Sequence, residues 1–146
     1  MGIGDFVTKL IATTQASDIF GYVAEDNEKI VGCVFFSRLM VPSGQVAFIL
    51  SPMAVATEMQ GKGIGQKLIN NGLEYLKSEN ADLVFTYGDP SYYAKTGFEQ
   101  ISENIVTAPY PLSQQIGWLA QSLDGKPIQA MQGATQCVDA LNDPTL

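Results

Sequence analysis

Histidine is absent from this chain of 146 residues. Without an imidazole, neither a Ser-His-Asp triad nor a Cys-His pair can operate, and zinc sites that need histidine ligands are excluded. Cysteine is scarce as well: Cys33 and Cys137 lie far apart and form no C-x-x-C pair, which argues against metal clips and thioredoxin-like redox chemistry. We therefore expect no metal, and any catalysis must use carboxylates, tyrosine, lysine, backbone amides or a bound cofactor.

Basic residues and long apolar runs are also few. The chain has 8 Lys and Arg residues against 15 Asp and Glu residues, a net charge of −7. Nucleic-acid binding depends on a basic surface, so we expect no nucleic-acid partner. No stretch approaches the roughly 20 apolar residues of a membrane span, and the first residues lack the basic and apolar regions of a secretory signal. We expect no membrane association and a cytoplasmic location.

The composition is that of a folded domain. Apolar residues make up 46% of the chain and charged residues 16%, which favours a buried core over disorder. The length fits one domain, and no repeat, low-complexity tract or linker divides the sequence. We therefore predict a single domain over residues 1–146.

Strand-forming residues are concentrated in the first half of the chain. Residues 19–25 and 30–39 are separated by a short polar turn, and the second run is rich in β-branched and aromatic side chains, which predicts an antiparallel hairpin. Residues 46–56 form a third strand. Pro52 within it predicts a bulge or a break in the ladder, because proline has no backbone N–H. Before the hairpin, the apolar spacing of residues 4–16 predicts a helix.

An amphipathic helix follows the third strand. Its apolar positions fall on one stripe at helical spacing: Ile64, Leu68, Ile69, Leu73 and Leu76. A fourth strand at 82–87 makes residues 46–87 a strand–helix–strand unit with the crossover length of a parallel pair. A short helix at 91–95 and a strand at 118–123 come later. The expected class is α/β (α+β), with a mixed, mainly antiparallel sheet, a central strand–helix–strand unit and flanking helices.

The segment Gln60-Gly61-Lys62-Gly63-Ile64-Gly65 joins the third strand to this helix. The first turn of a helix has unpaired N–H groups and the positive end of the dipole, so it attracts phosphate, and glycines let a ligand approach the backbone. A Walker loop would need glycine at Gln66. The G-x-G-x-x-G fingerprint fails at Gln66 or at Leu68. The segment therefore predicts an anion site that matches neither of these two motifs.

The spacing that does fit is Q-x-x-G-x-G, at Gln60, Gly63 and Gly65. It resembles the acetyl-coenzyme A signature of the GNAT superfamily of N-acetyltransferases. L-S-P-M-A-V at 50–55 resembles the family's fourth strand, and G-D-P-S-Y-Y-A-K-T-G-F at 88–98 resembles a segment of the YhbS-like branch. The resemblance covers roughly residues 19–98 and implies the GNAT fold.

The resemblance also implies acetyl-coenzyme A as co-substrate. The main chain of Met53, Ala54 and Val55 would pair with the pantetheine arm as an added strand, and a break at Pro52 would leave backbone groups available for it. Lys62 could add a point charge or could simply be a solvated lysine. The backbone amides expected to hold the pyrophosphate are those of Gln60, Gly61, Lys62, Gly63, Ile64, Gly65 and Gln66.

For the chemistry, the resemblance places a general acid at Tyr93, four residues before Gly97. Its phenol would protonate the departing thiolate; a role limited to packing or orienting the thioester stays open. Tyr92 is expected to point elsewhere and pack, and Asp89 to cap the short helix. The general base is open, with Glu58 a candidate for a proton relay through water.

The leading hypothesis is an N-acyltransferase that moves an acetyl group from acetyl-coenzyme A to a primary amine of a small molecule or protein, by direct attack in a ternary complex. Only residues 1–18 precede the hairpin, so we expect this sequence to lack the first strand and part of the lid that the family resemblance implies. An exposed sheet edge would invite a homodimer. The alternatives are a catalytically weak acyl-coenzyme A binding module and a dinucleotide-dependent oxidoreductase.

Overall fold

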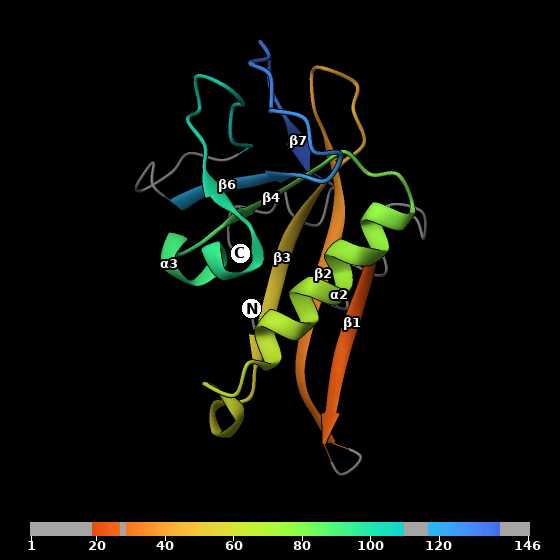
Figure 1. The fold of residues 1–146 in the computed structure, drawn as a ribbon, viewed down its shortest axis with the longest axis vertical. Helices are drawn as coiled ribbons and strands as arrows, with labels where there is room; N and C mark the ends of the chain where they lie inside the picture. Colours follow the sequence, from red (N-terminus) through yellow and green to blue (C-terminus); the bar gives the residue numbers. More distant parts are fainter. Residues whose placement is uncertain (1–18, 27–28, 110–116, 138–146) are drawn as a thin grey trace.

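The structure is a computed structural model that describes residues 19–26, 29–109 and 117–137. Its strands are β1 (Ile19–Asp26), β2 (Lys29–Met40), β3 (Ala47–Val55), β4 (Leu83–Tyr87), β5 (Glu99–Gln100), β6 (Trp118–Ser122) and β7 (Gln136–Cys137). Its helices are the 3-10 turn η2 (Thr57–Met59), the long helix α2 (Ile64–Ser78), the short helix α3 (Pro90–Tyr93) and the 3-10 turn η3 (Ala94–Thr96). Figure 1 shows their arrangement.

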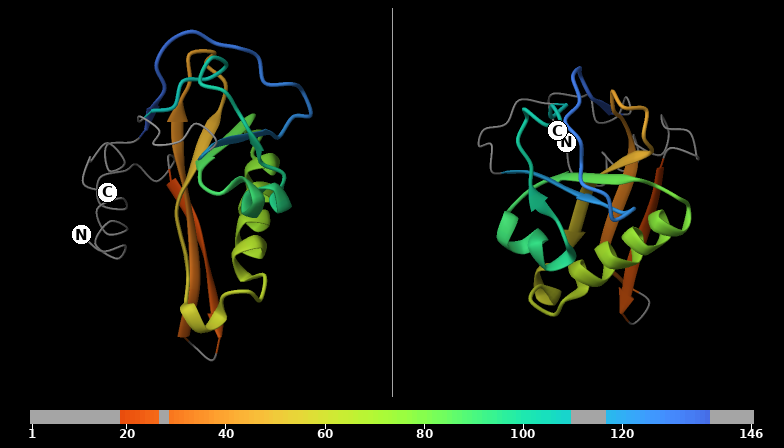
Figure 2. Two further views of the ribbon diagram at one scale, coloured as in Figure 1. Left: turned by 90° about the vertical axis from the view of Figure 1, so that its left-hand side faces the viewer. Right: turned by 45° about the horizontal axis from the view of Figure 1, so that its top comes forward.

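Within these residues the strands form one sheet in the order β1-β2-β3-β4-β6-β5, and β7 pairs with β2 off this path. β1 pairs antiparallel with β2, and β2 pairs antiparallel with β3; the first pair confirms the predicted hairpin. β3 and β4 are parallel, so the predicted strand–helix–strand unit is also confirmed. α2 and α3 lie on the same side of the long strands (Figure 2). The helix predicted at 4–16 lies outside the described residues.

The ladder between β2 and β3 changes register next to Pro52. Val34 pairs with Met53 and Phe36 pairs with Leu50, so β2 advances two residues where β3 advances three. The extra residue lies in the segment of β3 that contains Pro52, which confirms the predicted bulge. On the other side of β3, the pairing with β4 ends at Leu50 and Thr86. Beyond the bulge, therefore, β3 keeps β2 as a neighbour and has no described partner on the β4 side.

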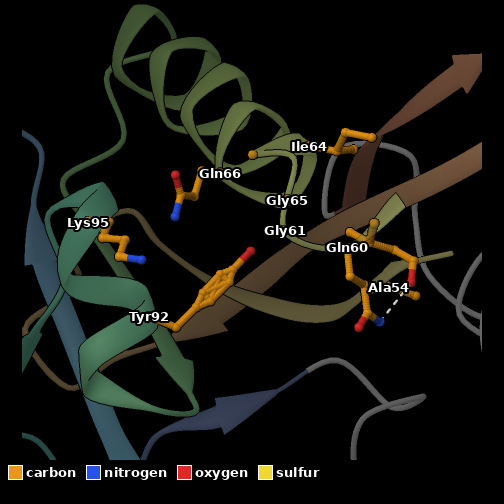
Figure 3. A pocket seen from close by; sticks show the side chains of 10 residues that line it. Ala54, Gln60, Gly61, Ile64, Gly65, Gln66, Tyr92 and Lys95 are labelled. Carbon is orange, nitrogen blue, oxygen red and sulfur yellow. Dashed lines mark hydrogen bonds between the residues drawn. The ribbon is translucent and has the colours of Figure 1, made fainter. Parts of the chain in front are cut away.

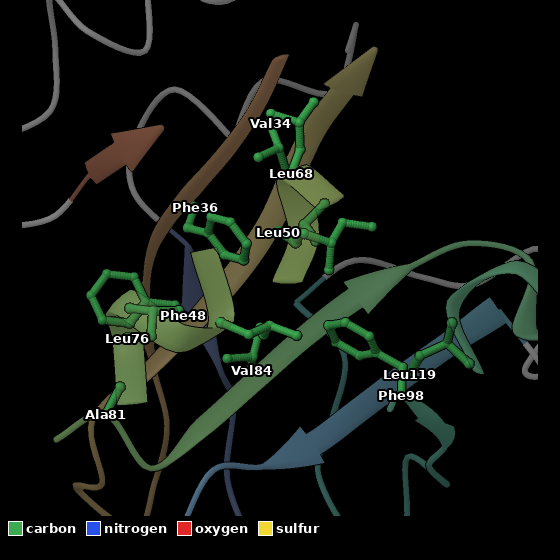
Figure 4. Close-up of a cluster of buried hydrophobic side chains, with 12 residues drawn as sticks. Val34, Phe36, Phe48, Leu50, Leu68, Leu76, Ala81, Val84, Phe98 and Leu119 are labelled. Carbon is green, nitrogen blue, oxygen red and sulfur yellow. The ribbon is translucent and has the colours of Figure 1, made fainter. Parts of the chain in front are cut away.

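Helix α2 packs its apolar stripe on the sheet, as predicted. Leu68, Ile69, Leu73 and Leu76 are buried, and each such side chain contributes about 1.5–3 kcal/mol when it is removed from water. Gly72 faces the same way, and a Cβ there would overlap the ring of Phe36. The helix can approach the sheet this closely only because position 72 has no side chain. Figure 4 shows the resulting cluster, which is made of Val34, Phe36, Phe48, Leu50, Leu68, Ile69, Leu73, Leu76, Ala81, Val84, Phe98 and Leu119.

A second apolar cluster covers the opposite face of the sheet. β4 alternates between the two, with Val84 in the α2 cluster and Leu83 and Phe85 in the second one. Trp118 stacks on Phe85 with ring centroids 5.1 Å apart, and its Nε1 donates to a buried backbone carbonyl, that of Val106. β4 is thus covered on both faces, which explains its continuous apolar sequence.

Strand β7 was not predicted. It is two residues long and joins the sheet by pairing Leu39 with Cys137. Burial raises the pKa of the Cys137 thiol to about 12. A strand this short has no periodicity to detect, so its sequence carries no signal. No helix in the described part of the chain has both the length and the apolar character that crossing a bilayer demands.

Candidate functional site

A pocket of about 850 Å³ opens between the end of β3, the start of α2 and the α3–η3 turn (Figure 3). The residues that line it come from two stretches of sequence that are far apart. They are Ala54, Val55, Gln60, Gly61, Gly63, Ile64, Gly65, Gln66, Tyr92 and Lys95. The pocket therefore gathers most of the glycine segment predicted as an anion site, together with two residues that the sequence did not single out for it.

The wall formed by residues 60–66 is built from backbone. Gly61 and Gly63 have φ angles of +83° and +79°, in the left-handed region that L side chains disfavour. A Cβ at either position would meet nothing within 4 Å, so the conformation of the chain, and not crowding, calls for glycine. Gly63 is also the N-cap of α2, where no side chain caps the helix and no acidic residue occupies the first turn. The unpaired N–H groups and the positive end of the helix dipole are therefore available to an anion.

Gln60 ties this wall to the end of β3. Its side-chain amide donates to the carbonyl of Val55 at 3.2 Å, and its backbone N–H donates to Thr57 at 3.3 Å. The first residue of the Q-x-x-G-x-G spacing thus has its backbone amide engaged within the protein. It fixes how the loop leaves the strand.

The opposite wall is built from side chains. Tyr92 and Lys95 are three residues apart on the α3–η3 turn, so they share a face, and both point toward the loop and Gln66 (Figure 3). The expectation that Tyr92 would point elsewhere is therefore wrong. The reason is that Tyr93 packs edge-on against Phe98, with ring centroids 5.7 Å apart, and successive helical residues point about 100° apart. The i, i+3 relation of Tyr92 and Lys95 was the signal available in the sequence.

Tyr93 lies behind Tyr92, and their rings stack with centroids 5.1 Å apart. Tyr93 does not line the pocket; its phenol hydrogen-bonds with the Thr86 side chain. The Thr86 hydroxyl is buried and donates to the Leu50 carbonyl at 3.0 Å, at the last paired position of β3 and β4. Burial raises the pKa of the Tyr93 phenol, and the hydrogen bond to Thr86 partly opposes this. The phenol therefore stays protonated at neutral pH, as a proton donor must.

Two further predicted residues, Met53 and Lys62, are chain neighbours of residues that line the pocket. Met53 pairs with Val34 of β2, directly before the lining residue Ala54. Lys62 is exposed within the loop, between the lining residues Gly61 and Gly63. The structure thus places both next to the pocket along the chain, and the exposed side chain of Lys62 is not among those that line it.

Asp89 and Glu58, the two carboxylates considered from the sequence, each interact with other groups of the protein. Asp89 caps α3 by accepting from the Ser91 N–H at 2.9 Å and from its hydroxyl at 2.8 Å, as expected, and these bonds lower the pKa of its carboxyl. The Glu58 side chain is 61% exposed, lies 3.8 Å from the Lys29 ammonium and does not line the pocket. Neither carboxylate is positioned as a general base in this pocket.

Comparison with known proteins gives the family. Residues 17–100 match the acetyltransferase (GNAT) domain. The chain is 32% identical over 141 residues to the uncharacterized N-acetyltransferase YjhQ of Escherichia coli K12. This alignment covers 92% of the present chain and 77% of YjhQ. It is 28% identical over 121 residues to the N-acetyltransferase YhbS of the same strain, covering 82% of this chain and 70% of the relative.

Solved structures confirm the fold. The crystal structure of YhbS from Escherichia coli in complex with CoA matches with a TM-score of 0.82 at 24% identity, over 96% of this chain and 77% of that one. A GNAT family acetyltransferase from Brucella melitensis, in complex with acetyl-CoA, matches with a TM-score of 0.71 at 26% identity, over 94% of this chain and 77% of that one. Because the GNAT domain matches more than half of this chain, the chain belongs to the GNAT family of N-acetyltransferases.

Proposed function

We propose that this chain transfers the acetyl group of acetyl-coenzyme A to a primary amine of a small molecule or protein, by direct attack in a ternary complex. One observation carries the proposal. The segment of β3 without a β4 partner leads into the uncapped N-terminus of α2, and both open onto one pocket. The relatives YhbS and the Brucella acetyltransferase, crystallised with CoA and acetyl-CoA, support this ligand class.

The anionic part of the cofactor fits the backbone wall. The uncapped first turn of α2 and the left-handed Gly61 and Gly63 direct successive N–H groups at the pocket. A pyrophosphate bound there accepts hydrogen bonds from the uncapped first turn of α2, at the positive end of the helix dipole. In this proposal the pyrophosphate is bound by Gly61, Lys62, Gly63, Ile64, Gly65 and Gln66. Gln60, whose backbone N–H already donates to Thr57, positions the loop.

The pantetheine arm fits the free side of β3. Met53, Ala54 and Val55 pair with β2 on one side, whereas the β4 pairing has already ended at Leu50. Backbone groups on that side need partners, and the amide-bearing arm can supply them as an added strand does. Its thiol end then lies toward the point where β3 and β4 diverge, next to Thr86 and Tyr93.

In the reaction, the neutral amine attacks the thioester carbonyl, so a C–N bond forms and an oxyanion develops, which backbone N–H groups stabilise. The C–S bond then breaks, and the thiolate takes the phenol proton of Tyr93 to leave as coenzyme A thiol. The attacking nitrogen, cationic once the C–N bond has formed, gives its proton to water, and water returns a proton to the Tyr93 phenolate. The raised pKa of Tyr93 suits a donor that must hold its proton until the thiolate leaves.

Family membership sets aside the dinucleotide-dependent oxidoreductase. The homodimer remains a prediction: among the described residues β1 stands at one end of the strand order, and its Val23 is 51% exposed. Light scattering that gives a monomer mass at micromolar concentration would contradict it.

Calorimetric titration of the purified chain with acetyl-coenzyme A, and with NAD as control, tests the binding. Release of coenzyme A thiol is then followed with a chromogenic thiol reagent across a panel of primary amines. We expect the chain to bind acetyl-coenzyme A and not NAD. We also expect thiol release to depend on the presence of an amine. A blank without amine corrects for protein thiols, which burial makes less reactive by raising the pKa of Cys33 and Cys137. Absence of acyl-coenzyme A binding would overturn the proposal; binding without turnover by any amine would leave a binding module.

A further inference from the structure

The wall opposite the glycine loop carries the charge of the pocket. Among the described residues that line it, Lys95 is the one ionisable cation, and no carboxylate is present. The whole chain has a net charge of −7, so a strongly anionic cofactor is repelled by most of the protein. Attraction must therefore come from local groups, and these include the α2 N-terminus on one side and Lys95 on the other.

The backbone that carries Lys95 is held in place. The hydroxyl of the buried Thr96 donates to the Tyr93 carbonyl at 2.9 Å, and the Gln121 side chain donates to the Thr96 carbonyl at 3.0 Å. Tyr92, on the same face, is fixed by stacking on Tyr93. These contacts come from β6 and from within the turn, and they direct Lys95 toward the loop (Figure 3).

We propose that Lys95 is a cofactor-binding residue that contacts a phosphate group of coenzyme A from the wall opposite the glycine loop, with the Tyr92 ring beside it. The inference rests on the proposed function. A phosphate in this pocket is held by backbone N–H groups on one side and by a flexible point charge on the other. The contact adds affinity and selects for the phosphorylated cofactor, and it takes no part in the chemical step.

Three variants test the contact by calorimetric titration with coenzyme A. Lys95→Gln removes the charge and Lys95→Arg keeps it. Lys77→Gln is the matched control, because it makes the same change in net charge from the last turn of α2, roughly 20 Å from the start of that helix at 1.5 Å per residue. We expect Lys95→Gln to weaken coenzyme A binding about fivefold, Lys95→Arg by less than about twofold, and Lys77→Gln not to change it.

Repeating the titrations with 3′-dephospho-coenzyme A identifies the phosphate. If Lys95 contacts the pyrophosphate, the loss in Lys95→Gln persists; if it contacts the 3′-phosphate, the loss disappears, and either result supports the proposal. With an active acceptor, the KM for acetyl-coenzyme A should rise about as much as the Kd while kcat is retained, which damage to the fold would not produce. Equal affinities of Lys95→Gln and Lys77→Gln would overturn the inference and leave the proposed function standing. Wild-type protein that binds no coenzyme A would overturn both.

Discussion

One wall of the pocket is formed mainly by backbone, and the opposite wall is formed by side chains. The wall at residues 60–66 presents backbone N–H groups, and three of its residues, Gly61, Gly63 and Gly65, have no side chain at all. The α3–η3 wall presents the side chains of Tyr92 and Lys95, with Tyr93 behind them. The first wall depends on φ angles and on where a helix begins. The second depends on which way individual side chains point.

This difference separates binding from chemistry. A backbone wall can bind an anion in the ground state, but it has no proton to give to a thiolate near neutral pH. Tyr93 can give one, and its phenol reaches the strands at Thr86 and not at the glycine loop. Substitutions in the first wall should therefore change cofactor affinity, and substitutions behind the second should change the rate. Single substitutions on either side of the pocket can break that division.

Tyr93→Phe should give the largest effect. Loss of a general acid lowers kcat by about 10²-fold, whereas the ring that packs on Phe98 is retained and acetyl-coenzyme A affinity should hardly change. Single-turnover kinetics with an active amine and calorimetry on the same protein measure the two quantities. Tyr92→Phe is the control, because it keeps the stacked ring and removes the neighbouring hydroxyl. Full kcat in Tyr93→Phe would show that Tyr93 only packs.

Gly63→Ala tests the backbone wall. A Cβ in the left-handed region costs about 1–2 kcal/mol, so the loop should shift, its N–H groups should turn away, and acetyl-coenzyme A binding should weaken about tenfold. Gly44→Ala is a matched control, since Gly44 has a φ of +76° and open space around it but lies in the turn before β3. Both variants should lose similar free energy of unfolding, and only Gly63→Ala should lose affinity. Equal affinities would remove the glycine loop from the binding site.

Thr86→Val tests whether Thr86 orients the phenol of Tyr93. The change removes the hydroxyl that donates to Leu50 and interacts with Tyr93, with little change in volume. Loss of a buried hydrogen bond costs about 1 kcal/mol of unfolding free energy, and a less well placed phenol should lower kcat by about fivefold. Thr86→Ser should restore most of kcat. An unchanged kcat in Thr86→Val would mean that Thr86 does not orient the donor.

The pH profile should show the smallest effect: kcat should not fall as the pH is raised. Activity that needs a protonated phenol falls as pH rises through its pKa, and burial moves the pKa of Tyr93 above its ordinary value of 10.0. The kcat should therefore rise with deprotonation of the amine and show no fall up to about pH 9.5. A decline that begins below about pH 9 in stable protein would assign the proton donor to another group.

The sequence was sufficient to predict those structural features whose physical cause lies within a short segment of the chain. Pro52 has no N–H to donate, so a bulge in β3 followed from one residue, and the register change beside it confirmed this. The apolar stripe of α2 and the turn at Gly61 and Gly63 are also properties of short segments. The parallel pairing of β3 and β4 followed from the length of the crossover. Most of one wall of the pocket could therefore be predicted.

Only the tertiary structure decided which tyrosine faces the pocket. Tyr92 and Tyr93 are adjacent and chemically identical, so no local rule separates them; the contact of Tyr93 with Phe98 turns Tyr93 inward and Tyr92 toward the loop. Lys95 follows Tyr92 onto the pocket wall for the same reason, and β7 forms only because Cys137 meets Leu39 of a distant strand. A backbone-built wall is specified by its own residues, whereas a wall of side chains is set by the residues packed behind it.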